Sequence, residues 1–357
     1  MQTSIMKIMQ LTLILTLLGV FAPDVFAGYK VVDYGQVVTE SGTTYDDGDG
    51  YMGAALTVTD DGFYSGTNIT LNATGYWAGA LVLFSGSLSL TDSTINLISS
   101  PLGVYAQEGC TITLDHVNIT GAGLGIGILS ESTATLTNIN INTTGVDTGS
   151  LFLDIDSSVT VYLNGNTLTN DANSIFVNAA STLTLTGSNG SVITGDITAS
   201  NGDYGASTVT LTLTGEGTAL HGDLIKEDST ITITLSAGAL LDGAGEVSNL
   251  TLNPGAILGY TDGLTVTDTI TIGAGITIDF SSLTETDNYL VLDWTGASIS
   301  GGSISDDQFT ATNAEGTFSV QGAQLYFNAT AVPEPSTWFL LGAGLGALAL
   351  TTRRRRS

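Results

Sequence analysis

Short stretches in which apolar residues alternate with Thr or Ser recur along most of this chain. The clearest are apolar–Thr/Ser–apolar triplets, and the last residues of five successive triplets are Leu90, Leu114, Leu136, Val161 and Leu185. Alternation with a period of two places the apolar side chains on one side of an extended strand and the hydroxyl side chains on the other. The triplets follow one another at steps of 22 to 25 residues, and such a period is typical of a solenoid.

Each period contains two further alternating segments. After the triplet that ends at Leu114 these are 117–119 and 125–129, and in the next period they are 139–141 and 151–153. Gly, Asn and Asp residues, which favour turns, lie between the segments. Three strands per turn predict an all-β fold, a right-handed parallel β-helix, which we assign to residues 67–280. About nine turns of roughly 4.8 Å each would form a rod about 40 Å long.

The triplets continue with a looser step beyond Gly195. They end at Leu213, Ile233, Leu252 and Ile272 and continue the alternating pattern. An array of immunoglobulin-like sandwiches is the alternative fold. It predicts domains of about 100 residues with longer hairpins rather than a short repeat.

The segments on either side of the repeat differ from it, and solenoids need capped ends. We assign residues 28–66 to an N-terminal cap and residues 281–331 to a C-terminal β cap with closing hairpins. The first segment is rich in aromatic residues, so a surface that stacks on sugars is its alternative interpretation. Its aromatic residues are Tyr29, Tyr34, Tyr45, Tyr51, Phe63 and Tyr64.

The body resembles pectin-lyase-like parallel β-helices. Its segment 316–327 resembles the ends of autotransporter-associated β-strand repeat passengers. No β-barrel sequence follows that segment, so the resemblance does not imply an autotransporter mechanism.

The first 27 residues have the pattern of a secretory signal peptide. Lys7 precedes a mostly apolar stretch at 8–20, and Val25 and Ala27 supply small residues at the −3 and −1 positions of a cleavage site. The apolar stretch is shorter than the roughly 20 residues that a bilayer-spanning helix needs. We therefore expect export and cleavage after Ala27.

The C-terminal segment 332–357 has three parts in a fixed order. Val332, Pro333, Glu334 and Pro335 precede an apolar stretch at 338–350, and Arg353, Arg354, Arg355 and Arg356 follow it. An apolar stretch with a basic flank is typical of a transmembrane segment whose end stays in the cytoplasm. A plain membrane anchor is the alternative, but it gives no reason for two prolines around a glutamate.

The order Pro-Glu-Pro, apolar stretch and basic end resembles the PEP-CTERM sorting signal of Gram-negative bacteria. The resemblance implies that exosortase, a membrane-embedded processing enzyme, is a partner that recognises residues 333–335, while residues 353–356 stop transfer. It also implies an inner-membrane-anchored precursor. The mature protein would then stand at the cell surface or in an extracellular matrix with exopolysaccharide.

The charge is sparse and strongly negative. Only 11% of the 357 residues are charged, 34 acidic residues face 7 basic ones, and the net charge is −27. Between residues 27 and 333 the only basic residues are Lys30 and Lys226. Because binding to phosphates or anionic lipids requires Lys and Arg, this composition excludes nucleic acids and anionic membrane surfaces as partners of the body.

The sequence offers little catalytic chemistry, and we predict no catalytic residue. A polysaccharide lyase or glycoside hydrolase on the same scaffold is the alternative, and Asp154 and Asp156 are its best carboxylate pair, on one face of an expected strand. His116 and His221 are far apart in the sequence and match no metal or triad motif.

A cofactor is not expected, and Ca²⁺ is the open alternative. Asp46, Asp47 and Asp49 are weak candidates for its ligands, because Ca²⁺ prefers carboxylate oxygens, and a solvated turn is the simpler interpretation. Cys110 is the only cysteine, which excludes an intramolecular disulfide and favours a buried thiol. The sequence thus predicts an exported structural or interaction protein.

Overall fold

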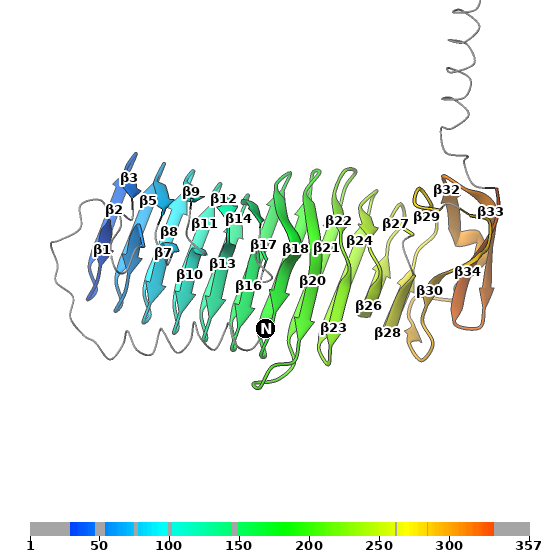
Figure 1. The fold of residues 1–357 in the computed structure, drawn as a ribbon. Helices are drawn as coiled ribbons and strands as arrows, with labels where there is room; N and C mark the ends of the chain where they lie inside the picture. The colour runs from blue at the N-terminus through cyan, green and yellow to red at the C-terminus, as the bar shows by residue number, and fades with distance from the viewer. Residues whose placement is uncertain are drawn as a thin grey trace, which may run out of the picture.

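The chain winds into one parallel β-solenoid of about 10 turns (Figure 1). The computed structural model describes residues 29–46, 54–74, 78–98, 102–144, 149–260, 263–283 and 285–331. Within these ranges the only helical element is a short 3-10 turn, η1 (Asp306–Gln308). None of the described segments forms a helix long and apolar enough to cross a bilayer.

Three faces run along the rod, and the chain visits them in the order C, A, B in each turn. Face A consists of β2 (Val37–Ser41), β5 (Phe63–Thr67), β8 (Ser87–Thr91), β11 (Thr111–Asp115), β14 (Thr133–Thr137), β17 (Ser158–Asn164), β19 (Thr182–Ser188), β21 (Thr208–Thr214), β24 (Thr230–Ser236), the second halves of β26 (Gly245–Leu252) and β28 (Leu264–Ile272), and β31 (Ser298–Ile299).

The other two faces are built in the same way. Face B consists of β3 (Thr44–Asp46), β6 (Thr70–Ala73), β9 (Thr94–Leu97), β12 (Asn118–Ala122), β15 (Asn140–Thr144), the first parts of β18 (Thr167–Val177) and β20 (Val192–Ser200), β22 (Ala219–His221), β25 (Leu240–Asp242), β27 (Ile257–Gly259), β29 (Ile276–Asp279) and β32 (Phe309–Thr312). Face C consists of β1 (Lys30–Val32), β4 (Leu56–Val58), β7 (Ala78–Leu83), β10 (Leu102–Gln107), β13 (Leu124–Leu129), β16 (Leu151–Asp154), the second parts of β18 and β20, β23 (Leu224–Glu227), the first parts of β26 and β28, and β30 (Asn288–Asp293).

Every strand of one turn pairs in parallel with its counterpart in the next turn, which rules out the sandwich alternative. Ile112 of β11, for example, pairs with Leu88, as the triplets predicted. Farther along, Leu213 pairs with Leu235, so the triplets that end at Leu213 and Ile233 are offset by two residues. Strands β21 and β24 are apolar at every second position over their whole length, so the pattern alone fits both registers.

The interior is a continuous apolar core. In β11 and β14 the burial alternates along the strand, with Ile112, Leu114 and Leu136 fully buried and the threonines between them exposed. Burying one such side chain stabilises the fold by roughly 1.5–3 kcal/mol. Burial of the core is therefore the main source of stability for the coil. The outer threonines contribute by favouring an extended backbone.

A row of small hydrogen-bonding residues lies inside the coil just before face A. Its members are Cys110, Ser132, Ser157, Ser181, Ser207 and Ser229, all of them buried. The N–H group of Cys110 donates to the Ser132 hydroxyl at 3.1 Å, and Ser207 donates in the same way to Ser229. The row satisfies backbone groups where each turn bends away from the strand ladder.

A smaller apolar cluster lies outside the coil on face C. Leu124 and Tyr105 belong to this cluster and not to the main core. Both lie close to Gly127: a β-carbon at that position would be 3.2 Å from a methyl group of Leu124 and 3.4 Å from the Tyr105 ring. Phe152 and Phe176 stack in the same cluster with their ring centroids 5.6 Å apart. Face C therefore carries apolar side chains on both of its sides, toward the core and on the outside of the coil.

The two ends of the rod are built differently. Parallel stacking already begins at β1, inside the segment that the sequence assigns to the N-terminal cap. In this first turn the Glu40 carboxylate accepts hydrogen bonds from Lys30, at 2.8 Å, and from Tyr45 and Tyr64. Polar side chains thus occupy the end of the interior.

An antiparallel hairpin closes the other end, within the predicted C-terminal cap. Strands β33 (Glu315–Gln321) and β34 (Gln324–Ala331) form the hairpin, and β34 also pairs antiparallel with β30. Phe327 stacks on Phe280 of the last turns, with ring centroids 4.0 Å apart. A change from parallel to antiparallel pairing gives the last strands partners that another turn would otherwise provide.

Candidate functional site

The corner between faces C and A has the same backbone turn in seven successive turns of the rod. There the chain passes through two consecutive residues with positive φ: Tyr34-Gly35, Asp60-Asp61, Phe84-Ser85, Glu108-Gly109, Ser130-Glu131, Ile155-Asp156 and Ala179-Ala180. The N–H group of the second residue donates to the carbonyl oxygen of the first residue in the next turn, at 2.9–3.2 Å. Equivalent side chains therefore stand in a row, roughly 4.8 Å apart.

An open hollow of about 680 Å³ lies over the first four of these turns. Its lining consists of Tyr34, Gly35, Asp60, Asp61, Phe84, Ser85 and Glu108. The Tyr34 side chain is 82% exposed. Of these residues only Tyr34 stands out in the sequence, as one of several aromatic residues before the repeat. The signal for the others is the 24-residue step from Asp60 to Phe84 and on to Glu108, which equals the step of the triplets.

The carboxylates of Asp154 and Asp156 do not share one face of a strand, contrary to expectation. Strand β16 ends at Asp154, and Asp156 belongs to the corner turn, where its φ is 56°. Asp154 is buried, which raises the pKa of its carboxyl group, while hydrogen bonds from Ile155 N–H and Asn178 oppose that effect. Asp154 accordingly has a structural role in holding the corner.

The two histidines and two lysines of the described chain each have an acidic neighbour. His116 lies 2.9 Å from Asp115, and His221 lies 3.1 Å from Asp242 in the next turn. Lys226 donates to Glu246 at 2.7 Å, as Lys30 does to Glu40. These are four separate pairs along the rod, and the structure does not bring the histidines together.

Of the predicted cation ligands, Asp46 lies at the end of β3 on face B. Its carboxylate accepts a hydrogen bond from Asn72 at 2.6 Å, and Asn96 in turn donates to Asn72 at 2.7 Å. Asp47 and Asp49 lie outside the described residues. Among the described residues no three Asp, Glu, His or Cys side chains come together in a way that suits a metal ion.

Cys110 has its place in the inner row of serines. Its thiol donates to the Gln107 carbonyl oxygen at 3.0 Å. Burial raises the pKa of this thiol from about 9 to about 11, against the opposing effect of nearby backbone hydrogen bonds. The thiol is therefore protonated and unreactive at neutral pH.

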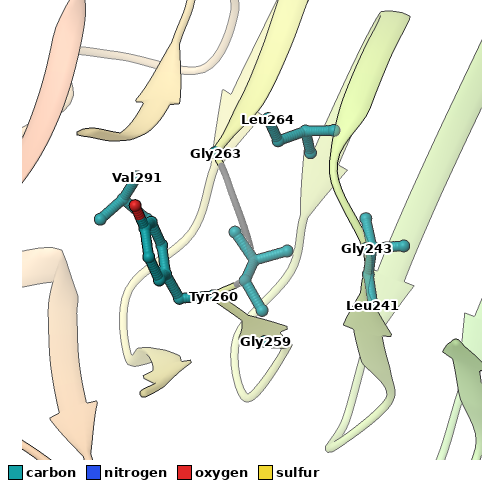
Figure 2. Close-up of a pocket in the computed structure, with 8 residues that line it drawn as sticks. Leu241, Gly243, Gly259, Tyr260, Gly263, Leu264 and Val291 are labelled. Atoms are coloured by element: carbon teal, nitrogen blue, oxygen red, sulfur yellow. The ribbon is translucent and has the colours of Figure 1, made fainter. Parts of the chain in front are cut away.

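A second cavity, between the turns near the C-terminal end, is too small for a ligand. It holds about 10 Å³, and Leu241, Leu264, Tyr260 and Val291 are among its lining residues (Figure 2). A volume of this size accommodates about one water molecule. Of these two concave surfaces, only the hollow at the C–A corner is large enough for a ligand.

The predicted processing residues lie outside the described part of the chain: Ala27 before β1, and Val332, Pro333, Glu334, Pro335 and Arg353, Arg354, Arg355 and Arg356 after β34. The predicted transmembrane segment lies there as well.

Comparison with known proteins identifies the C-terminal segment. The family model of the PEP-CTERM protein-sorting motif matches residues 331–356. No curated protein and no solved structure matches the chain. The resemblance of the body to autotransporter passengers and pectin lyases thus stays an expectation, whereas the sorting motif is established. This motif marks exported proteins of Gram-negative bacteria that exosortase sorts at the membrane.

Proposed function

We propose that this protein is an exported, non-enzymatic scaffold of the cell surface or of an exopolysaccharide matrix. In the proposed precursor, the signal peptide is removed after Ala27, and residues 338–350 hold the chain in the inner membrane with Arg353–Arg356 in the cytoplasm. Exosortase then acts at Pro333-Glu334-Pro335. The match of residues 331–356 to the sorting motif is the observation that carries this proposal.

The body supports the same role in two ways. Its strands form a single rod with a continuous core, so its shape does not depend on a ligand or a disulfide. Its charge of −27 over the whole chain keeps such a rod solvated and apart from anionic surfaces. Both properties suit a spacer or contact surface outside the cell.

The test is the mature C-terminus of the protein in a host that contains exosortase. We expect mass spectrometry of the wild-type protein to show a chain that ends before Arg353. A Pro333→Ala/Pro335→Ala variant should accumulate as the membrane-bound, full-length form, because the recognition element is gone. Glu334→Gln should reduce processing, whereas Glu315→Gln, at an exposed position in β33, should leave it unchanged.

An intact Arg356 in the surface-exposed wild-type protein would refute processing at the motif. Turnover of neutral or uronic-acid polysaccharides by the purified protein would overturn the non-enzymatic part of the proposal and favour the lyase or hydrolase alternative.

A further inference from the structure

The first position of the C–A corner turns alternates between aromatic and acidic residues at the N-terminal end of the rod. Tyr34, Asp60, Phe84 and Glu108 occupy this position in four consecutive turns, and all four line the hollow. Because each turn advances roughly 4.8 Å, the backbone positions of Tyr34 and Phe84 lie two turns, about 10 Å, apart, with Asp60 at the turn between them. The hydrogen-bonded turn backbones hold this row in place.

The aromatic residues are poorly suited to this position on grounds of stability. Phe84 has a φ of 51° and Tyr34 a φ of 46°, in the left-handed region that bulky side chains disfavour. The Tyr34 side chain is 82% exposed and thus gains little from the core. The same turn position is filled by Ser130, Ile155 and Ala179 farther along, so an aromatic ring is not needed to form the turn. An exposed aromatic residue in a strained turn points to contact with a ligand.

The chemistry of the row suits a polymer with the same kind of repeat. The C–H faces of pyranose rings pack on aromatic side chains, which offer a large apolar surface at small entropic cost. Carboxylates accept strong, charge-assisted hydrogen bonds from hydroxyl groups. An extended β-linked glycan presents ring faces and hydroxyl groups in regular succession.

The charge at the hollow restricts the class of glycan. Asp60, Asp61 and Glu108 line it, and no basic residue does. A polyuronate would be repelled by these carboxylates, whereas an uncharged glycan meets only hydrogen-bond acceptors and aromatic rings.

We propose that the hollow at the C–A corner binds an extended, uncharged, β-linked polysaccharide, with Tyr34 and Phe84 stacked on its sugar rings and with Asp60 and Glu108 accepting hydrogen bonds from its hydroxyl groups. The proposal deepens the proposed function, on which it rests for the choice of a matrix polysaccharide as the natural ligand. Polysaccharide binding is measured on purified protein and sorting is measured in cells, so either proposal can be refuted independently of the other.

The test is affinity gel electrophoresis of the protein purified as its host processes it. Native gels would contain hydroxyethylcellulose or galactomannan, which are uncharged, or alginate, which is a polyuronate. We expect an uncharged glycan to retard the wild-type protein and alginate to have no effect. Phe84→Ala and Tyr34→Ala should each raise the dissociation constant by roughly tenfold, as expected when an anchoring aromatic contact is lost.

Two matched controls separate the site from general effects. Ile155→Ala changes the same turn position, with a φ of 51°, three turns beyond Phe84, and Tyr162→Ala removes a 49% exposed aromatic residue from face A. Both should bind as the wild type does. Phe84→Tyr should keep binding, which guards against misfolding as the cause of a loss, and circular dichroism checks each variant. No retardation by either uncharged glycan, equal binding by all variants, or stronger retardation by alginate would overturn the proposal.

Discussion

At the corners of the coil, very different residues adopt the same left-handed backbone conformation. At the C–A corner even Ile155 and Ala179 adopt positive φ, a conformation that costs a non-glycine residue about 1–2 kcal/mol. The hydrogen bond from each turn to the next offsets part of this cost. Inside the same corner, Cys110 and the serines that follow it in successive turns bind backbone groups that the strand ladders leave unpaired. The bend in each turn thus depends on backbone contacts to its neighbours more than on the residue that occupies it.

The Cys110 thiol gives a prediction at this scale. Its pKa is about 9 in the unfolded chain and is raised to about 11 by burial, so the folded protein holds the proton more tightly. The stability from this group is therefore fully present below pH 9 and is lost as the pH rises through 11. We expect the free energy of unfolding to fall by about 2 kcal/mol more in the wild type than in Cys110→Ser over this interval.

Urea denaturation at pH values on both sides of the interval measures the effect. Burial also raises the pKa of Tyr64, but that residue is present in both proteins, so the difference between them isolates the thiol. Parallel loss of stability in the two proteins would contradict the prediction.

The sequence determines the core of the coil far better than its corners. Leu88, Ile112 and Val159 are buried, as the triplets predicted. A strand with an apolar residue at every second position has one apolar side, and that side must face the core. Phe84 and Ile155 were not identified as turn residues, since the left-handed conformation is usually read from Gly or Asn. For the same reason Asp154 and Asp156 were placed on one strand, although Asp156 lies in the corner turn that follows the strand.

At the scale of elements, the aromatic end differs from the rest of the rod. Phe280, Phe309, Phe318 and Phe327 pack together between the last turns and the closing hairpin. The range 281–331 was assigned to a cap with closing hairpins, and β33 and β34 form such a hairpin. The antiparallel pairing of β30 with β34 could not be predicted, since the pattern of a strand does not specify the direction of its neighbour.

Phe327→Ala should open this end first. The ring is fully buried, and its loss from a packed core costs about 3–5 kcal/mol. In a solenoid each turn contacts only its neighbours, so we expect hydrogen exchange to accelerate in β29, β30, β33 and β34 while β8 and β11 keep their protection. Phe63→Ala, which removes a 38% exposed ring near the other end, serves as the control. Uniform acceleration along the rod, or none, would refute local opening.

For the whole molecule, the dominant feature is the excess of acidic residues. With a net charge of −27 and only two ion pairs formed by the lysines of the described chain, like charges repel along the rod. We expect the unfolding temperature to rise by a few degrees as NaCl increases from about 10 to 150 mM, because the Debye length falls from about 30 to 8 Å. Differential scanning calorimetry at constant pH measures this, and a flat or falling midpoint would show that repulsion is unimportant.

The stacking of near-equivalent turns also bears on how such a chain evolves. The residues added by duplicating one turn, such as β11 to β13, would meet above and below them the same apolar triplets and the same corner that they meet now. The length of the molecule can therefore change by insertion or deletion of a genetic unit of about 24 codons without a new interior having to arise, and both the sorting segment and the closing hairpin would be carried along unchanged.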